Sequence, residues 1–170
     1  QTDRTLEIGP GMFPHVPIAG TYFVDLSRHA LKALAAQGGL CAVATTPLPY
    51  ADERFDLVCL FEVLEHVAED EALLGEIARV MTPGGHLFFS CPCNPDYWTY
   101  YDKVMGHERR YRGSELQERL CRAGFVIGDK ALAYAKVGYT NARIETEGFG
   151  GDMATVRAGA EPASLVAKRR

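Results

Sequence analysis

The sequence has no apolar run near the roughly 18–20 residues that a membrane-spanning helix needs, and no signal-peptide pattern precedes its first apolar segment. Basic residues are not in excess: the formal net charge is −4, which disfavours a broad nucleic-acid-binding surface. The 5 cysteines include no C-x-x-C pair, and no matching Cys/His pair supports zinc. They lie mostly in apolar segments, which indicates reduced thiols in a cytoplasmic protein. We therefore expect no membrane, nucleic-acid or metal partner.

The composition is that of one globular domain, residues 1–170. Of these residues, 47% are hydrophobic and 24% are charged, which is ordinary for a soluble protein with a sizeable core. Short apolar runs alternate with segments of helical periodicity, and this predicts a parallel α/β sheet with helices on both faces. The predicted strands span 6–8, 22–24, 40–44, 57–60, 86–90 and 125 to about 132, with a turn at 82–85. The predicted helices begin at the cap Ser27, at Asp70 and at the capping box of Ser114, and they end at Gln37, Met81 and Gly124.

Residues 5–27 carry the clearest functional signal. The first strand ends in a turn with Gly9 and Gly11, where the backbone can bend sharply and a ligand can approach without meeting a Cβ atom. The second strand is followed by Asp25, at the position where parallel α/β sheets accept hydrogen bonds from ribose hydroxyls. We therefore predict a nucleoside-containing cofactor across the carboxyl ends of strands one and two.

The turn suits S-adenosylmethionine (SAM) better than a dinucleotide. A dinucleotide site needs a third glycine and a helix N-terminus for the pyrophosphate. Here Phe13 stands in the turn, and Pro14 and Pro17 prevent a clean helix start. Glu7 would repel a phosphate but suits a cation. SAM contains ribose and adenine, has no phosphate and carries a positive sulfonium, so it matches these residues.

Five successive motifs resemble those of class I SAM-dependent methyltransferases and are most similar to the small-molecule group called type 11. They are LEIGPG, FVDLS, LPYADERFDLV, FEVLEHV and RVMTPGGHLFFS, and the resemblance covers residues 5 to about 125. It implies a Rossmann-like, mostly parallel seven-stranded sheet whose last strand, at 164–168, is antiparallel and lies between strands five and six. Relatives usually have cofactor-covering helices before the glycine strand. Because that strand comes almost first here, we expect either that residues before it are missing from the sequence or that the cofactor site is more open than usual.

The resemblance also implies the cofactor contacts. Glu7, Gly9 and Gly11 should border the methionine moiety and the ribose, and Asp25 should bind the ribose hydroxyls. Ala44 stands where many relatives have an acidic residue near the adenine, so the backbone around Thr45 should hold that ring. Phe61 could face the sulfonium by cation–π attraction or could be a core residue. The predicted cofactor-binding residues are Glu7, Gly9, Gly11, Asp25, Leu26, Thr45 and Phe61.

Residues 91–112 follow the fifth strand and concentrate aromatic residues and arginines, which indicates a lid over a small-molecule acceptor. The arginines would suit a carboxylate or phosphate on that acceptor. The alternative is a helix that packs through its aromatic residues and leaves its arginines in solvent. The candidate acceptor contacts are Tyr97, Trp98, Tyr101, Arg109, Arg110 and Tyr111.

Two histidines are candidate general bases, a role that methyl transfer requires only when the acceptor is protonated. They are His66, one turn beyond the fourth strand, and His107, in the lid. Each has a structural alternative: His66 could tie a helix to a loop, and His107 could be an exposed loop residue.

We therefore predict direct in-line methyl transfer from SAM to a small molecule. The alternative is an inactive SAM-binding protein with a regulatory or partner role. A short-chain reductase is disfavoured, because no lysine follows a tyrosine at the spacing which that chemistry uses. Residues 133–162 are rich in Gly, Thr and Ala, and they predict an irregular arm or a contact in a homodimer.

Overall fold

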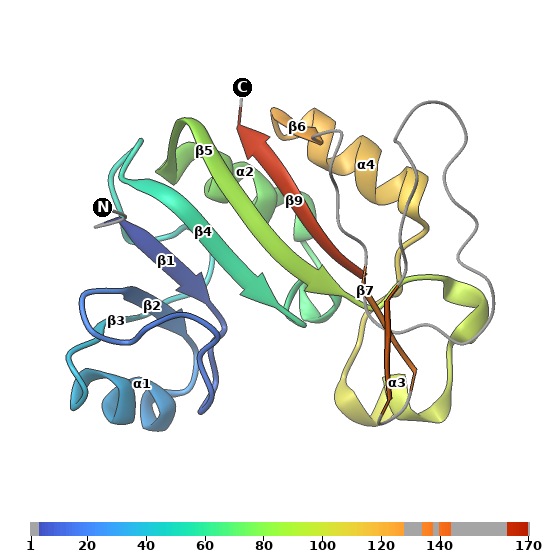
Figure 1. Ribbon diagram of the computed structural model, residues 1–170, viewed down its shortest axis with the longest axis horizontal. Coiled ribbons are helices and arrows are strands. Elements are labelled where there is room, and N and C mark those ends of the chain that lie inside the picture. The colour runs from blue at the N-terminus through green and yellow to red at the C-terminus, as the bar shows by residue number, and fades with distance from the viewer. Residues whose placement is uncertain (1–3, 128–133, 138–139, 144–162, 170) are drawn as a thin grey trace.

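The computed structural model describes residues 4–127, 134–137, 140–143 and 163–169, and its ribbon is built on one twisted sheet (Figure 1). The strand order in this sheet is β3-β2-β1-β4-β5-β9-β6. The strands are β1 Thr5–Ile8, β2 Tyr22–Asp25, β3 Leu40–Val43, β4 Phe55–Phe61, β5 Met81–Cys91, β6 Phe125–Ile127 and β9 Ala163–Arg169. The helices are α1 Arg28–Ala35, α2 Asp70–Val80, α3 Tyr100–Met105 and α4 Gly113–Arg122, with short 3-10 helices η1 Leu64–His66 and η2 Pro95–Tyr97.

The sheet is mostly parallel, as the sequence predicts. Parallel pairing joins β3 to β2, β2 to β1, β1 to β4 and β4 to β5. The strand β9 covers the segment expected as the last strand, and it runs antiparallel to both of its neighbours, β5 and β6. The carboxyl ends of the five parallel strands therefore share one edge of the sheet, where open α/β folds bind their ligands.

Helices cover both faces of the sheet, and β2 shows how. Phe23 packs with Leu31 and Leu34 of α1 in a small hydrophobic cluster. The next residue, Val24, belongs to the large core cluster, which also contains Leu74 of α2. Because successive residues of a strand point to opposite faces, α1 and α2 lie on opposite sides of the sheet.

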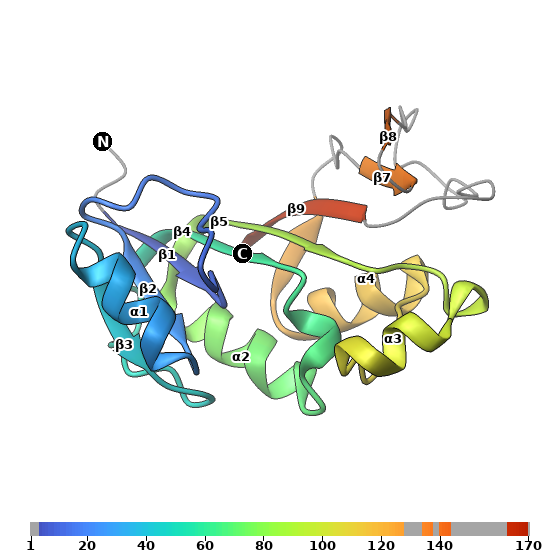
Figure 2. The same cartoon turned by 90° about the horizontal axis from the view of Figure 1, so that it is seen from below.

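The large cluster is the main core of the fold. β1 is buried along its whole length, and its residues Leu6 and Ile8 face this cluster. Leu116 and Leu120 bring α4 into the same core. Figure 2 shows α2 on one side of the sheet and the loop between β1 and β2 on the other. That loop contains no helix; Val16 and Ile18 pack it against the small cluster, and hydrogen bonds hold the glycine turn.

Two local predictions are wrong. Residues 82–85 do not form a turn before the fifth strand but lie inside β5, where the pairing shifts from Phe55–Met81 to Leu57–His86. The pairing irregularity takes up the extra residues without ending the strand. The predicted capping box at Ser114 is also wrong: α4 begins at Gly113, and its N-cap Arg112 makes no side-chain capping bond.

The predicted arm at 133–162 is described only in part. Strands β7 Tyr134–Val137 and β8 Thr140–Arg143 pair antiparallel as a separate two-stranded sheet. The rest of the arm, with the dimer contact expected there, and most of the predicted strand beyond Ile127 lie outside the described residues. Among the helices of the described part, none combines the length and apolar character needed to cross a membrane.

Candidate functional site

The glycine turn is packed against the segment that leaves β4. Gly9 has φ +67°, its N–H donates to the Val24 carbonyl at 2.8 Å, and a Cβ atom there would lie 2.6 Å from Cγ2 of Val63. Gly11 also has a positive φ of +54°, but a Cβ there would meet nothing within 4 Å. Both positions favour glycine for backbone reasons. At Gly9, packing requires it as well.

Asp25 is fixed at the end of β2, beside the glycine turn. One carboxylate oxygen accepts from the Gly11 N–H at 2.9 Å, and the other accepts from the Ser27 N–H at 2.7 Å. Ser27 in turn caps α1, as predicted, because its hydroxyl accepts from the Ala30 N–H at 3.2 Å. Each carboxylate oxygen can accept more than one hydrogen bond, so Asp25 keeps capacity for a ligand.

Glu7 holds the loop between β1 and β2. Its carboxylate is 1% exposed and accepts from the His15 N–H at 3.0 and 3.1 Å, with the His15 Nδ1 also 3.1 Å away. The His15 ring lies on the ring of Phe61, with centroids 4.3 Å apart. The predicted cofactor residues Glu7 and Phe61 are thus joined through His15, a residue that the sequence analysis did not single out.

The other predicted cofactor residues lie at the same edge. Leu26 follows β2 and is 68% exposed, and Thr45 lies just beyond β3 and is also exposed. The register pairs Asp25 with Val43, so the chain leaves β2 and β3 at adjacent points. The structure therefore gathers Gly9, Gly11, Asp25, Leu26, Thr45 and Phe61 at the carboxyl ends of β1 to β4.

The chain turns sharply where it leaves β4. Glu62 has a positive φ of +53°, its N–H donates to the Ser90 carbonyl at 3.0 Å, and its carboxylate accepts from the Ser90 hydroxyl at 2.6 Å. This turn leads into η1, which carries Glu65 and His66. Burial raises the pKa of the fully buried Glu65 carboxyl to about 8, opposed by its own backbone N–H and aided by the charge of Glu62.

The two candidate bases come together. The ring centroids of His66 and His107 are 4.8 Å apart, with the planes at 80°. The His66 Nδ1 lies 3.2 Å from the Gly106 carbonyl oxygen, and the His107 Nδ1 lies 2.9 Å from a carboxylate oxygen of Asp102. The bond from His66 to Gly106 agrees with the structural alternative for His66, which ties a helix to a loop. The alternative for His107 is wrong, because its side chain is only 9% exposed and contacts Asp102. Neither alternative predicts the edge-to-face contact between the two rings.

The segment 91–112 has an exposed aromatic side and a buried ionic side. Trp98 and Tyr101 are exposed, and Tyr97 is half-buried. In contrast, Arg110 is 4% exposed and donates to both oxygens of the buried Asp102, at 2.6 and 3.0 Å. Burial acts to raise the pKa of Asp102, but hydrogen bonds from Arg110, Thr99 and His107 outweigh it and hold that pKa well below its usual range. Arg110 is therefore a structural residue, which corrects its assignment as an acceptor contact.

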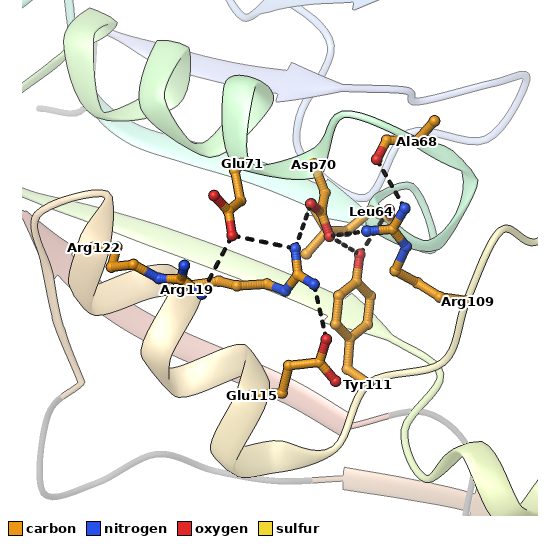
Figure 3. Close-up of polar contacts among 9 residues, drawn as sticks. All are labelled: Leu64, Ala68, Asp70, Glu71, Arg109, Tyr111, Glu115, Arg119 and Arg122. Carbon is orange, nitrogen blue, oxygen red and sulfur yellow. Dashed lines mark hydrogen bonds and ion pairs between the residues drawn. The ribbon is translucent and has the colours of Figure 1, made fainter.

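A second buried carboxylate, Asp70 at the start of α2, is the centre of another network (Figure 3). It accepts from Arg109 at 3.0 Å, from Arg119 of α4 at 2.7 Å and from the Tyr111 hydroxyl at 2.8 Å. Tyr111 is completely buried. Burial, followed by the bond to Asp70, raises the pKa of its hydroxyl well above the usual range. Tyr111 and Arg109 thus fasten the segment to α2, and the assignment of Tyr111 to an acceptor pocket is corrected in the same way.

Comparison with known proteins finds similarity to methyltransferases in sequence and in fold. Residues 6–89 match the type 11 family model described as a methyltransferase domain. A demethylmenaquinone methyltransferase of Mycobacterium tuberculosis is 35% identical over 122 residues, which cover 61% of this chain and 52% of the relative. The chain thus spans about half the length of these curated relatives.

Solved structures agree in fold. A SAM-dependent methyltransferase of Methanosarcina mazei superposes with a TM-score of 0.70 at 14% identity, covering 99% of this chain and 93% of that one. One from Thermotoga maritima gives 0.69 at 17% identity, covering 98% and 82%. The sheet order, the glycine turn followed by Asp25 and these similarities agree: together they support a class I SAM-dependent methyltransferase, with S-adenosylmethionine as the implied cofactor.

Proposed function

We propose that this chain binds SAM along the carboxyl ends of β1 to β4 and transfers its methyl group to a small-molecule acceptor. The observation that carries the proposal is the Asp25 carboxylate, held beside the glycine turn by the N–H groups of Gly11 and Ser27. A carboxylate at this edge can accept hydrogen bonds from ribose hydroxyls. The open space at Gly11 leaves room for a ligand against the backbone.

The remaining edge residues fit the other parts of SAM. The backbone near Thr45 can hold the adenine, with the exposed Leu26 as an apolar neighbour. Phe61 is held between His15 and Phe88, at centroid distances of 4.3 and 5.7 Å, so its ring is braced on the way out of β4. A braced ring can attract a sulfonium through cation–π interaction. The buried Glu7 supports this surface by fixing the loop that carries His15.

The reaction needs little covalent work from the protein. SAM, when bound, supplies a methyl group already activated by the positive sulfur. The chain contributes orientation and exclusion of water, which can lower a barrier substantially by making donor and acceptor neighbours. His66 and His107 lie just beyond the exit of β4, where an acceptor hydroxyl could lose its proton.

The exposed aromatic side of 97–105 favours an acceptor with apolar surface. Trp98, Tyr100 and Tyr101 are exposed there, whereas Arg109 and Arg110 are engaged with Asp70 and Asp102. Aromatic side chains bind flat apolar groups well. The curated relatives named as demethylmenaquinone methyltransferases support a small molecule as acceptor.

Calorimetric titration with SAM, S-adenosylhomocysteine and NADH tests the cofactor site. We expect both sulfur compounds to bind and NADH not to bind. Asp25→Ala should weaken SAM binding by about 1–3 kcal/mol, roughly 5- to 150-fold, because hydrogen bonds to a charged acceptor are lost. Asp52→Ala, at an exposed position away from this edge, is the matched control and should bind SAM normally. Unchanged affinity in Asp25→Ala would refute the placement of the cofactor.

Turnover is tested separately. Formation of S-adenosylhomocysteine in the presence of a small aromatic or quinol-type acceptor would support the enzyme. SAM that binds tightly and stays intact with every acceptor offered would instead identify an inactive SAM-binding protein of the same fold.

A further inference from the structure

Three side chains that can bind a metal ion converge beyond β4. Glu65 and His66 come from η1, and His107 comes from the segment that follows α3. One carboxylate oxygen of Glu65 and one ring nitrogen of each histidine all lie within 4.8 Å of one another. The sequence analysis sought metal ligands among the cysteines and missed this group, because the chain brings His107 to the other two only through folding.

The Glu65 carboxylate lacks the partners that a buried charged group normally has. Its side chain is completely buried, and neither oxygen accepts a hydrogen bond in the described structure. Leaving a buried carboxylate unsatisfied is costly. A cation at this point would give both oxygens a partner and offset their charge.

Both histidines are oriented as metal-binding histidines usually are. The Nδ1 of His107 faces the Asp102 carboxylate, and the Nδ1 of His66 faces the Gly106 carbonyl. These partners accept, so in the neutral form of each ring the proton lies on Nδ1 and the lone pair on Nε2. Asp102 is itself locked by Arg110 and by the Thr99 N–H at 2.7 Å. A carboxylate or carbonyl behind the ring is the arrangement that fixes the tautomer of a metal ligand.

We propose that Glu65, His66 and His107 bind one divalent transition-metal ion, with Zn²⁺ as the best match, and that its open position receives an oxygen of the acceptor. Two imidazoles and one carboxylate are a known donor set for zinc with a free fourth position. Metal bonds of about 2.0–2.1 Å place tetrahedral ligands ~3.3 Å apart, so the three groups must close by about 1.5 Å. The exposed side chain of His66 can make that movement.

The acceptor part of this inference rests on the proposed function. A cation lowers the pKa of a bound hydroxyl, so the acceptor would reach the methyl group as its oxyanion. The two imidazoles would then act as ligands, and the proton would leave to solvent. A hydroxyl on an aromatic or quinol-type ring fits this role, because a phenol has a pKa of about 10 and binding to a cation can bring it into the neutral range.

Metal binding can be measured without any acceptor. The chain, freed of metal with a chelator, is titrated calorimetrically with ZnCl₂ and, separately, with MgCl₂. Co²⁺ is then added in place of Zn²⁺ and followed by its visible absorption. We expect one Zn²⁺ per chain, much weaker binding of Mg²⁺, and a Co²⁺ spectrum of low coordination number. Glu65→Gln and His66→Gln should each weaken Zn²⁺ binding at least about tenfold. Loss of a group that only hydrogen-bonds to a metal ligand already costs about that much, and these variants change a ligand itself.

His29→Gln, an exposed histidine of α1, is the matched control and should leave Zn²⁺ binding unchanged. If Glu65→Gln does not fold, His66→Gln still decides, because that side chain is exposed. Absence of stoichiometric Zn²⁺ binding would overturn the proposal, as would binding that survives in both variants and so belongs to another group, such as the exposed thiol of Cys121. SAM titrations on the same samples separate the outcomes: SAM binding without Zn²⁺ refutes the metal site, and Zn²⁺ binding without SAM refutes the cofactor site.

Discussion

The contact between Gly9 and Val63 should be essential to the shape of the cofactor edge, and two glycines allow it to be measured. Gly9 and Gly11 both have positive φ, of +67° and +54°. An alanine at either position pays about 1–2 kcal/mol for that backbone conformation. Only at Gly9 would the new methyl group also collide, 2.6 Å from Cγ2 of Val63. Overpacking of this kind costs about 1–3 kcal/mol more.

We therefore expect Gly11→Ala to lower the free energy of unfolding by about 1–2 kcal/mol and Gly9→Ala by about 2–5 kcal/mol. Val63→Ala removes both γ carbons that the new methyl would meet. Combined with Gly9→Ala, it should recover about 1–2 kcal/mol, which appears as non-additivity in a double-mutant cycle. Urea denaturation of the unaltered chain, the three single variants and the double variant gives these values. SAM titration should show weaker binding for Gly9→Ala and partial recovery in the double variant.

Two results would refute this reasoning. Equal destabilisation by Gly9→Ala and Gly11→Ala would mean that the overlap with Val63 is relieved at no cost. Strict additivity of Gly9→Ala and Val63→Ala would mean that the two positions do not touch.

Two further predictions concern the ionic framework. Tyr111→Phe deletes a hydroxyl that donates to the buried Asp70 and should lower the free energy of unfolding by about 1.5–3 kcal/mol. Tyr100→Phe, at an exposed position, should change it by less than about 0.5 kcal/mol. Similar effects of the two variants in denaturant titrations would contradict the network. Acid should weaken the fold through carboxylates paired with arginine. Hydrogen bonds from Arg79 lower the pKa of Glu76, and those from Arg4 lower the pKa of Asp56. A carboxyl whose pKa is lower in the folded chain than in the unfolded chain, where it is near 4, stabilises the fold at pH values above about 4. That contribution is lost as the pH falls through the folded pKa. The urea midpoint should therefore drop below about pH 5, less steeply in Glu76→Gln than in the unaltered chain; identical slopes would exclude Glu76 as a source.

Local signals predicted the parts of the site that depend on local geometry. Gly9, Gly11 and Asp25 lie within one strand–turn–strand unit, and the Ser27 cap needs only its own helix, so spacing was enough to find them. Helix α2 was likewise recognisable from its apolar periodicity.

Partners from distant segments were not predictable in this way. Arginines and aromatic residues gather in lids and also in buried networks, and composition cannot distinguish the two. What decides the case for Arg110 and Tyr111 is the presence of Asp102 and Asp70 beside them. The turn predicted at 82–85 failed for a related reason, because pairing with β4 carries β5 through residues that favour a bend.

The division of the core into two unequal clusters has a consequence for local stability. The smaller cluster, under α1, has only Phe23, Leu31 and Leu34 as buried members, and the edge strand β3 beside it leaves Leu40 and Val43 partly in solvent. Backbone amides of β3 and α1 should thus open and exchange their hydrogens before those of β1 and β4. The proposed adenine and ribose contacts lie at the carboxyl ends of β2 and β3, beside this cluster. A ligand bound there would stabilise the least protected part of the sheet, in proportion to the logarithm of its concentration over its dissociation constant.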